Sequence, residues 1–255
     1  MNKRKMLAWA VLPALFLAAC GGSDDNLDDR LSVADPKLRM VHAVPGAPVV
    51  TLFRDGQAQT GQVADVPYKG ASNYIDMATS TNDWEVRTGT TPAVTVGDAT
   101  FEARRGHKYT LIAVPDGGSL TDVVLIDDPY DKGITSDDAR ARVFNAAFNA
   151  TSLDVYLTAP GTNLATVAPN FAAVGFKQAL PASGADSVSL DGGTYTLRLT
   201  TAGTKSVIFS ATVTLADNAD WLLLPVPASA SANDLRVLVI QSDAGAPATE
   251  LVNQP

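Results

Sequence analysis

Residues 38–53 read LRMVHAVPGAPVVTLF, and residues 141–156 read ARVFNAAFNATSLDVY. The two segments align without a gap, and the aligned pairs include Arg39 with Arg142, Val41 with Phe144, His42 with Asn145, Ala43 with Ala146 and Phe53 with Tyr156. An overlooked repeat leads to the wrong fold, so this pair is the starting point for the rest of the chain.

Further matches follow in the same order in both halves. They are YK at 68–69 with FK at 176–177, WEVR at 84–87 with YTLR at 195–198, KYTLIAV at 108–114 with DWLLLPV at 220–226, and 123–126 with 237–240. A conserved order of matches is the signature of one structural unit used twice. The sequence therefore predicts a tandem duplication.

Each copy consists of short β-type runs separated by turn residues. We expect strands near 38–44, 49–53, 72–78, 84–88, 93–96, 99–104, 108–114 and 120–126, and near 140–147, 152–158, 186–190, 194–200, 206–214, 220–226 and 235–241. Asp191-Gly192-Gly193 is predicted to be the turn of a hairpin. Short strands at this spacing favour an all-β chain of two antiparallel, Ig-like β-sandwiches over 37–135 and 136–245, with a C-terminal tail at 246–255.

Three segments of the first copy resemble one known family. LRMVHAVPGAPVVTLF at 38–53, YKGASNYIDM at 68–77 and GHKYTLIAV with its later LIDD, at 106–114 and 125–128, are similar to the domain of unknown function 4397. The second copy departs from the pattern, since Asn145-Ala146-Ala147 stands where the first has His42-Ala43-Val44. The resemblance covers about 37–245 and implies a β-sandwich module of secreted or lipid-anchored bacterial proteins. It implies no activity, cofactor or catalytic residue.

The N-terminus is typical of a secretory signal. Lys3, Arg4 and Lys5 precede an apolar run at 6–19 that is too short to span a bilayer. The run ends at Leu17-Ala18-Ala19-Cys20, which resembles the lipobox of bacterial lipoproteins, in which the signal (1–19) is removed and the cysteine acylated. An ordinary signal peptide with a cysteine near its cut is the alternative.

Lipidation of Cys20 would make the membrane a partner of the protein, because two or more acyl chains such as palmitate anchor stably. Gly21 follows the cysteine in place of the Asp that resembles an inner-membrane retention signal, which favours the outer membrane in a Gram-negative cell. Residues 20–36 are acidic and rich in turn formers, and we expect a flexible tether there.

Composition excludes several classes of function. The 255 residues carry a net charge of −8, with a pI near 4.6, which argues against nucleic acid as a partner. With only two His and one Cys, the chain lacks the side chains that most nucleophilic, redox and zinc sites require. A hydrolytic triad needs converging Ser, His and carboxylate groups, and no GxSxG is present. We expect no enzymatic activity, and we expect His42 and Asn145 to cap backbone groups at strand ends.

Two weak site candidates remain. Asp127, Asp128, Asp131, Asp137 and Asp138 lie between the copies, where they either bind calcium as a cofactor or form a solvated acidic linker. Arg104, Arg105, His107 and Lys108 either contact an anion or form a solvated hairpin rim.

Aromatic residues at matching positions are predicted to belong to the core. Trp84, Tyr109, Tyr195 and Trp221 recur in both copies, whereas Tyr68, Tyr74 and Tyr130 are better candidates for a surface platform. The expected function is a lipid-anchored cell-envelope protein that displays two sandwiches in a binding or structural role, with an envelope protein or glycan as partner. A carbohydrate- or cell-wall-binding module is the alternative, and an unfamiliar envelope enzyme is a further one.

Overall fold

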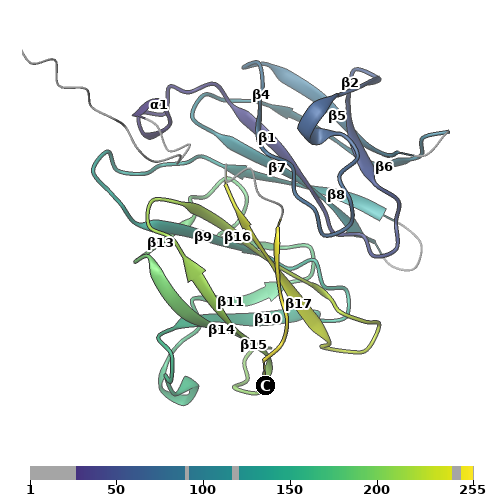
Figure 1. Ribbon diagram of the computed structural model, residues 1–255. Helices are drawn as coiled ribbons and strands as arrows, with labels where there is room; N and C mark the ends of the chain where they lie inside the picture. Colours follow the sequence, from purple (N-terminus) through teal and green to yellow (C-terminus); the bar gives the residue numbers. More distant parts are fainter. Residues whose placement is uncertain (1–26, 90–91, 117–120, 243–247, 255) are drawn as a thin grey trace, which may run out of the picture.

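The computed structural model describes residues 27–89, 92–116, 121–242 and 248–254, and these fold almost entirely into β-strands. Figure 1 shows two β-sandwiches, the first half of the chain above and the second half below. The all-β sandwich prediction is confirmed. Within the described ranges, no helix is long and apolar enough to cross a membrane.

The first sandwich contains one sheet in the order β4-β1-β7-β8 and another in the order β3-β2-β5-β6. Its strands are β1 (Lys37–His42), β2 (Val50–Arg54), β3 (Gln57–Ala58), β4 (Ile75–Asp76), β5 (Thr81–Thr88), β6 (Thr95–Glu102), β7 (Lys108–Pro115) and β8 (Thr121–Asp128), with a 3-10 turn η1 (Gly61–Val63).

The second sandwich contains one sheet in the order β12-β9-β16-β17-β18, with β13 also on β9, and another in the order β11-β10-β14-β15. Its strands are β9 (Ala139–Phe144), β10 (Ser152–Thr158), β11 (Phe171–Gly175), β12 (Ala179–Leu180), β13 (Val188–Leu190), β14 (Gly193–Thr201), β15 (Val207–Leu215), β16 (Asp220–Pro227), β17 (Leu235–Gln241) and β18 (Thr249–Leu251), with a 3-10 turn η2 (Leu164–Thr166).

The two halves pair corresponding strands in the same way. β1 lies between β4 and β7, and β9 lies between β12 or β13 and β16, so the aligned segments at 38–53 and 141–156 occupy equivalent places. Lys69 and Lys177, from the matching YK and FK pairs, both adopt positive φ, at 65° and 62°. The Lys69 N–H donates to the His42 carbonyl at 2.8 Å. The Lys177 N–H donates at the same distance to the carbonyl of Asn145, the residue that matches His42.

The sequence led us to expect antiparallel sheets, but two of the sheets also contain a parallel pair of strands. β1 pairs with β7 in parallel, and β9 pairs with β16 in parallel, while the other pairs are antiparallel. A parallel pair requires a long crossover connection. The chain supplies it with the strands of the opposite sheet, interrupted by β4 in the first half and by β12 and β13 in the second, which join the edge of the first sheet.

Burial explains why some strands alternate and others do not. β15 alternates between exposed and buried side chains, as expected for a sheet with one solvated face. All eight residues of β7 (KYTLIAVP) are buried. A continuous apolar run indicates a strand that is covered on both faces.

The second cover of β7 is the other sandwich. Each sandwich has its own core, and a third apolar cluster joins the β1–β7–β8 sheet to the β9–β16–β17 sheet. We call this cluster the interface core; it consists of Val41, Ala43, Ile112, Val114, Ile126, Phe144, Ala146, Leu222, Leu224, Val226, Leu238 and Ile240. The two sandwiches therefore form a stack of four sheets.

Several local expectations were wrong. The predicted strands at 93–96 and 99–104 are a single strand, β6. Asp191-Gly192-Gly193 is not a hairpin turn, because β13 pairs with β9 whereas β14 pairs with β10 and β15. The segment instead carries the chain from one sheet to the other, a distinction that turn chemistry does not make.

Both predicted ends are more ordered than expected. Within the tether, α1 (Leu27–Arg30) is a helical turn, and Arg30 donates to the carbonyls of Gly133 and Ile134 at 3.1 and 2.7 Å. At the other end, β18 lies in the predicted tail and pairs with β17. The tail then reaches the opposite sheet, where the Gln254 N–H donates to the Ser210 carbonyl at 2.7 Å.

Candidate functional site

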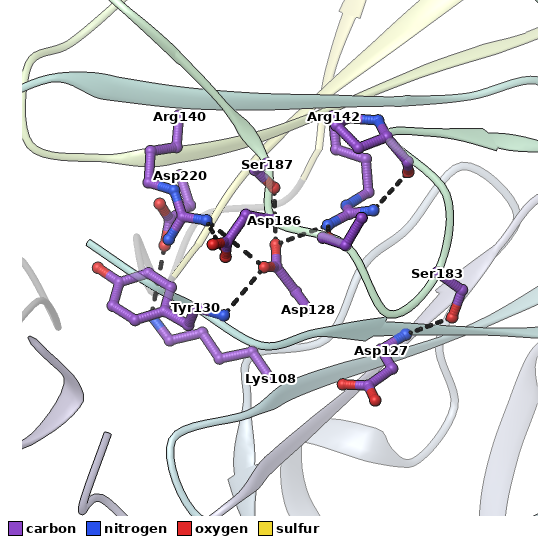
Figure 2. A network of polar contacts seen from close by, with 12 residues as sticks. Lys108, Asp127, Asp128, Tyr130, Arg140, Arg142, Ser183, Asp186, Ser187 and Asp220 are labelled. Atoms are coloured by element: carbon purple, nitrogen blue, oxygen red, sulfur yellow. Dashed lines mark hydrogen bonds and ion pairs between the residues drawn. The ribbon is translucent and has the colours of Figure 1, made fainter. Parts of the chain in front are cut away.

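Buried charges gather where the end of β8 meets β9 at one side of the interface core (Figure 2). We call this group the junction network, and it consists of Lys108, Asp128, Tyr130, Arg140, Arg142, Asp186, Ser187 and Asp220. The residues come from β7, β8 and the following loop, β9, the loop before β13, and β16. Both sandwiches therefore contribute to it.

Asp128 is the centre of the junction network. Its carboxylate lies 3.3 Å from Arg142 Nη2 and 3.6 Å from Arg140 Nη2, and it accepts a hydrogen bond from Ser187 Oγ at 2.6 Å. Burial alone would raise the pKa of Asp128, but the charges of Arg142 and Arg140 and the bonds from Ser187 and the Tyr130 N–H outweigh it and lower the pKa. Asp128 is therefore a fixed counter-ion for two buried arginines.

Arg140 and Lys108 share the faces of one tyrosine ring. Lys108 Nζ lies 3.9 Å and Arg140 Cζ 4.8 Å from the ring centroid of Tyr130, and Arg140 Nη2 donates to Asp186 at 2.8 Å. Such cation–π contacts are strongest where water is excluded. Tyr130 is only 1% exposed, so its predicted place on a surface platform is wrong.

Lys108 and Asp220 occupy matching positions in the two halves and meet at the interface. Their Nζ and Oδ2 atoms are 3.4 Å apart, and both side chains are largely buried. Burial raises the pKa of Asp220, and the charges of Lys108 and Arg140 offset this only in part. Contact between corresponding positions is typical of a two-fold arrangement.

Other contacts between the sandwiches follow the same arrangement. Lys69 of the first sandwich binds Glu250 of the second at 2.6 Å, and Lys177 of the second binds Asp122 of the first at 2.9 Å and also Asp116. Because Lys69 and Lys177 are the matching residues of the repeat, each half presents the same lysine to the other. The halves thus pack like the subunits of an isologous dimer.

The capping role predicted for His42 and Asn145 is confirmed. The Val44 N–H donates to His42 Nδ1 at 3.3 Å, and His42 Nε2 lies 3.0 Å from the Pro48 carbonyl. Asn145 repeats this pattern: its Oδ1 accepts from the Ala147 N–H at 3.0 Å, and its Nδ2 donates to the Ala150 carbonyl at 2.9 Å. Burial lowers the pKa of His42, so the imidazole is a neutral structural cap with both nitrogens engaged.

The five aspartates of the calcium hypothesis are not brought together. Asp128 is held by arginines, Asp127 accepts from His107 Nδ1 at 2.7 Å, and Figure 2 shows the Asp127 side chain pointing away from Asp128. Asp131 and Asp137 are exposed, and Asp138 is half-buried. In the part of the chain that the structure describes, no three His, Cys, Asp or Glu side chains are arranged to hold a metal ion.

The basic residues of the anion hypothesis also diverge. Lys108 is buried in the junction network, His107 pairs with Asp127, and Arg105 contacts Asp35 at 3.2 Å, whereas Arg104 is exposed. They do not form one open surface. Cys20 and the cleavage residues Leu17, Ala18 and Ala19 lie outside the described residues.

The repeated aromatics belong to the cores, as predicted. Trp84 and Tyr109 are almost fully buried in the first sandwich, and Tyr195 and Trp221 pack against the core of the second. Trp84 also borders a shallow groove of about 250 Å³ on the outer face of β5 and β6, which is otherwise lined by Asp83, Glu85, Thr95, Asp98 and Thr100.

Sequence reasoning missed the junction network. A usable signal was present, because Lys108 and Asp220 open two matching runs that are otherwise apolar. A charge at the start of a strand that is buried on both faces requires a buried partner. The alignment of the two halves identified the matching positions but did not indicate that they touch.

Fold and site together describe an all-β protein of two sandwiches joined by buried charges. The family model for the domain of unknown function DUF4397 matches residues 36–156, which span the first sandwich, β9 and most of β10. The match supports the family resemblance for this region. No curated protein matches the chain.

Proposed function

We propose that the protein is a lipid-anchored component of the bacterial cell envelope whose two sandwiches, tandem copies of one module, act as a single rigid, non-catalytic unit. The observation that carries the proposal is the interface core, which buries the facing sheets of both sandwiches against each other. A fused pair with a dry core and buried ion pairs presents its outer sheets in a fixed geometry, which suits display or spacing at a surface.

The state of the two histidines supports a non-catalytic role. His42 uses both ring nitrogens to hold its own loop, and His107 is bound to Asp127. A general base needs a free nitrogen within reach of substrate. The carboxylate at the centre of the junction network, Asp128, is committed to arginines and serves the packing of the halves.

The anchor is tested on the intact chain in its bacterial host. Cells grown with a clickable palmitate analogue should label the wild type and a Ser23→Ala control but not Cys20→Ala. Mass spectrometry should find an acylated N-terminal Cys20 in the wild type and retained signal residues in Cys20→Ala. Labelling of Cys20→Ala, or a mature N-terminus elsewhere, would reject the anchor.

The non-catalytic role is tested by crosslinking in intact cells, with wild type compared with Cys20→Ala. Capture of one envelope protein or glycan by the anchored form alone supports display. Asp83→Ala and Lys205→Ala then locate the face used, since Asp83 lies on β5 of the first sandwich and Lys205 in the turn between β14 and β15 of the second. Turnover of a captured compound by the purified protein would instead establish an enzyme.

Carbohydrate binding is the second candidate function. The groove beside Trp84 places three carboxylates and two threonine hydroxyls on one outer sheet, and such groups bind sugar hydroxyls. A glycan array should detect binding that Asp98→Ala weakens and Asp234→Ala, on the other sandwich, leaves unchanged. A wild type that binds no glycan would discard this candidate without affecting the first.

A further inference from the structure

A small cavity of about 20 Å³ lies between the two sandwiches, beside the junction network. The residues that line it include matching positions from the two halves: Arg39 with Arg142, Lys108 with Asp220, Asp128 with Ser242, and Tyr74 with Ser187. This volume accommodates one water molecule or one ion of similar size. The cavity thus sits where the approximate two-fold axis relates the halves.

The two arginines that line the cavity differ in how their charges are neutralised. Arg142 has Asp128 at 3.3 Å. Arg39 is only 5% exposed, yet its partners are the hydroxyl of Thr110, which accepts from Nε at 3.0 Å, and the ring of Tyr74 at 4.8 Å. Within the described part of the chain, no carboxylate lies within ion-pair distance of Arg39. The position that matches Asp128 is Ser242, which carries no charge.

The two carboxylates that line the cavity, those of Asp128 and Asp220, already have cationic partners. Asp128 is bound by Arg142 and Arg140, and Asp220 pairs with Lys108. Of the described residues that line the cavity, three are cationic (Arg39, Lys108 and Arg142) and two are acidic. An arginine does not lose its proton in a protein, and burying its charge without a partner is unfavourable. The described side chains that line the cavity therefore carry one more positive charge than negative charges, and Arg39 is the cation among them with no carboxylate partner in the described part of the chain.

We propose that this cavity binds a single small monovalent anion, of chloride size, between Arg39 and Ser242. The Arg39 guanidinium has N–H donors beyond the one given to Thr110, and the Ser242 hydroxyl is a further donor. The anion completes the pseudo-symmetric pair, so that Arg39 and the ion correspond to Arg142 and Asp128. It thereby stabilises the packing of the two sandwiches.

The proposal is tested by thermal unfolding of the mature protein at constant ionic strength. Sodium gluconate, whose anion is too large for the cavity, is replaced stepwise by chloride, bromide or acetate. Binding to the native state alone stabilises it by mass action, so we expect chloride and bromide to raise Tm by about 3–6 °C. A matching rise with acetate would widen the ligand class to a carboxylate group, and a rise confined to halides limits it to ions.

The decisive variant is Ser242→Asp, which supplies the missing carboxylate. It should unfold at a higher temperature than the wild type in gluconate and show no halide response. Ser206→Asp, which adds the same charge at an exposed position just before β15, should keep the full wild-type response. Arg39→Met should lose the response, and bromide in crystals of the wild type should give an anomalous peak beside Arg39.

Two results would overturn the proposal. One is a Tm of the wild type that is the same in gluconate and in every small anion. The other is a halide response that survives in Ser242→Asp.

Discussion

The two sandwiches share the order of their main strands but differ from each other in two ways, according to the kind of position. At the ends of β1 and β9, His42 and Asn145 are chemically different residues that make equivalent backbone contacts. Each accepts a hydrogen bond from the N–H two residues further on and engages a carbonyl of the loop that follows. At the interface, Lys108 and Asp220 are different residues that bind each other. Matching residues inside a sandwich, such as His42 and Asn145, play the same structural role. Matching residues on the approximate two-fold axis between the sandwiches, such as Lys108 and Asp220, carry opposite charges and bind each other.

The difference follows from what each position faces. His42 and Asn145 each satisfy backbone groups of their own loop, so any side chain with a donor and an acceptor at the right distance serves. A residue on the axis faces its own counterpart, and two copies of the first half would place Lys108 against Lys108. Like charges that are buried together are costly. A single chain that contains both halves avoids this repulsion, because one half can carry Lys108 and the other Asp220 at the matching position.

The largest predicted loss of stability comes from substituting Asp128, whose matching residue in the second half is the uncharged Ser242. Asp128→Asn leaves Arg140 and Arg142 buried without their shared counter-ion, and we expect it to lower the free energy of unfolding by about 3–5 kcal/mol. Chemical denaturation measures this. Asp98→Asn, at an exposed position of β6, is the control and should change stability by less than about 0.5 kcal/mol. A small effect of Asp128→Asn would mean that water reaches the arginines.

The second prediction concerns the interface core. Leu224→Ala removes buried methyl groups between the sandwiches and should cost about 2–5 kcal/mol, as should Leu199→Ala in the core of the second sandwich. If the stack unfolds as one unit, both variants keep a single transition. In a chain that lacks residues 1–19, and with them Trp9, tryptophan fluorescence follows each half separately, through Trp84 in Trp221→Phe and through Trp221 in Trp84→Phe. Two separated transitions in the wild type would contradict the rigid unit.

Sequence patterns were sufficient for features that depend on local chemistry. The alignment of 38–53 with 141–156 located equivalent strands, and the capping role of His42 and Asn145 followed from their shared place at strand ends. Alternation and turn residues predicted most strand positions. These features depend on residues close together in the chain, which a pattern records directly.

Features that depend on the stacking of the sandwiches were not predictable in this way. Asp127 and Asp128 look like one acidic pair, but successive residues of a strand point to opposite sides, so one meets His107 and the other Arg142. The turn at 191–193 has hairpin chemistry, although the sheet that each flanking strand joins is decided by distant partners. The continuous apolar run of β7 indicated that both faces of this strand are buried, but it did not indicate which element packs on the second face.

A smaller effect is expected where the halves are interchangeable. His42→Asn should change the free energy of unfolding by less than about 1 kcal/mol, because Asn145 makes equivalent contacts with its own loop in the second half. His42→Ala leaves the Val44 N–H and the Pro48 carbonyl without these bonds and should cost about 1–3 kcal/mol. Urea denaturation of the three proteins checks the order. Equal losses in both variants would show that the ring itself, packed near Tyr68, is what the fold requires.

The smallest effect is the dependence of stability on pH through His42. Burial lowers its pKa in the folded protein below the ordinary value of 6.5, so between those two pKa values the unfolded chain binds a proton that the native one does not. Stability from this group is therefore complete above about pH 6.5 and is lost as pH falls toward the folded pKa. His42→Asn lacks the group, so the wild type should lose stability relative to this variant between pH 7 and pH 5, with carboxylate effects cancelling in the difference. A difference that is flat over this range would mean that burial does not lower the pKa of His42, and it would contradict the prediction.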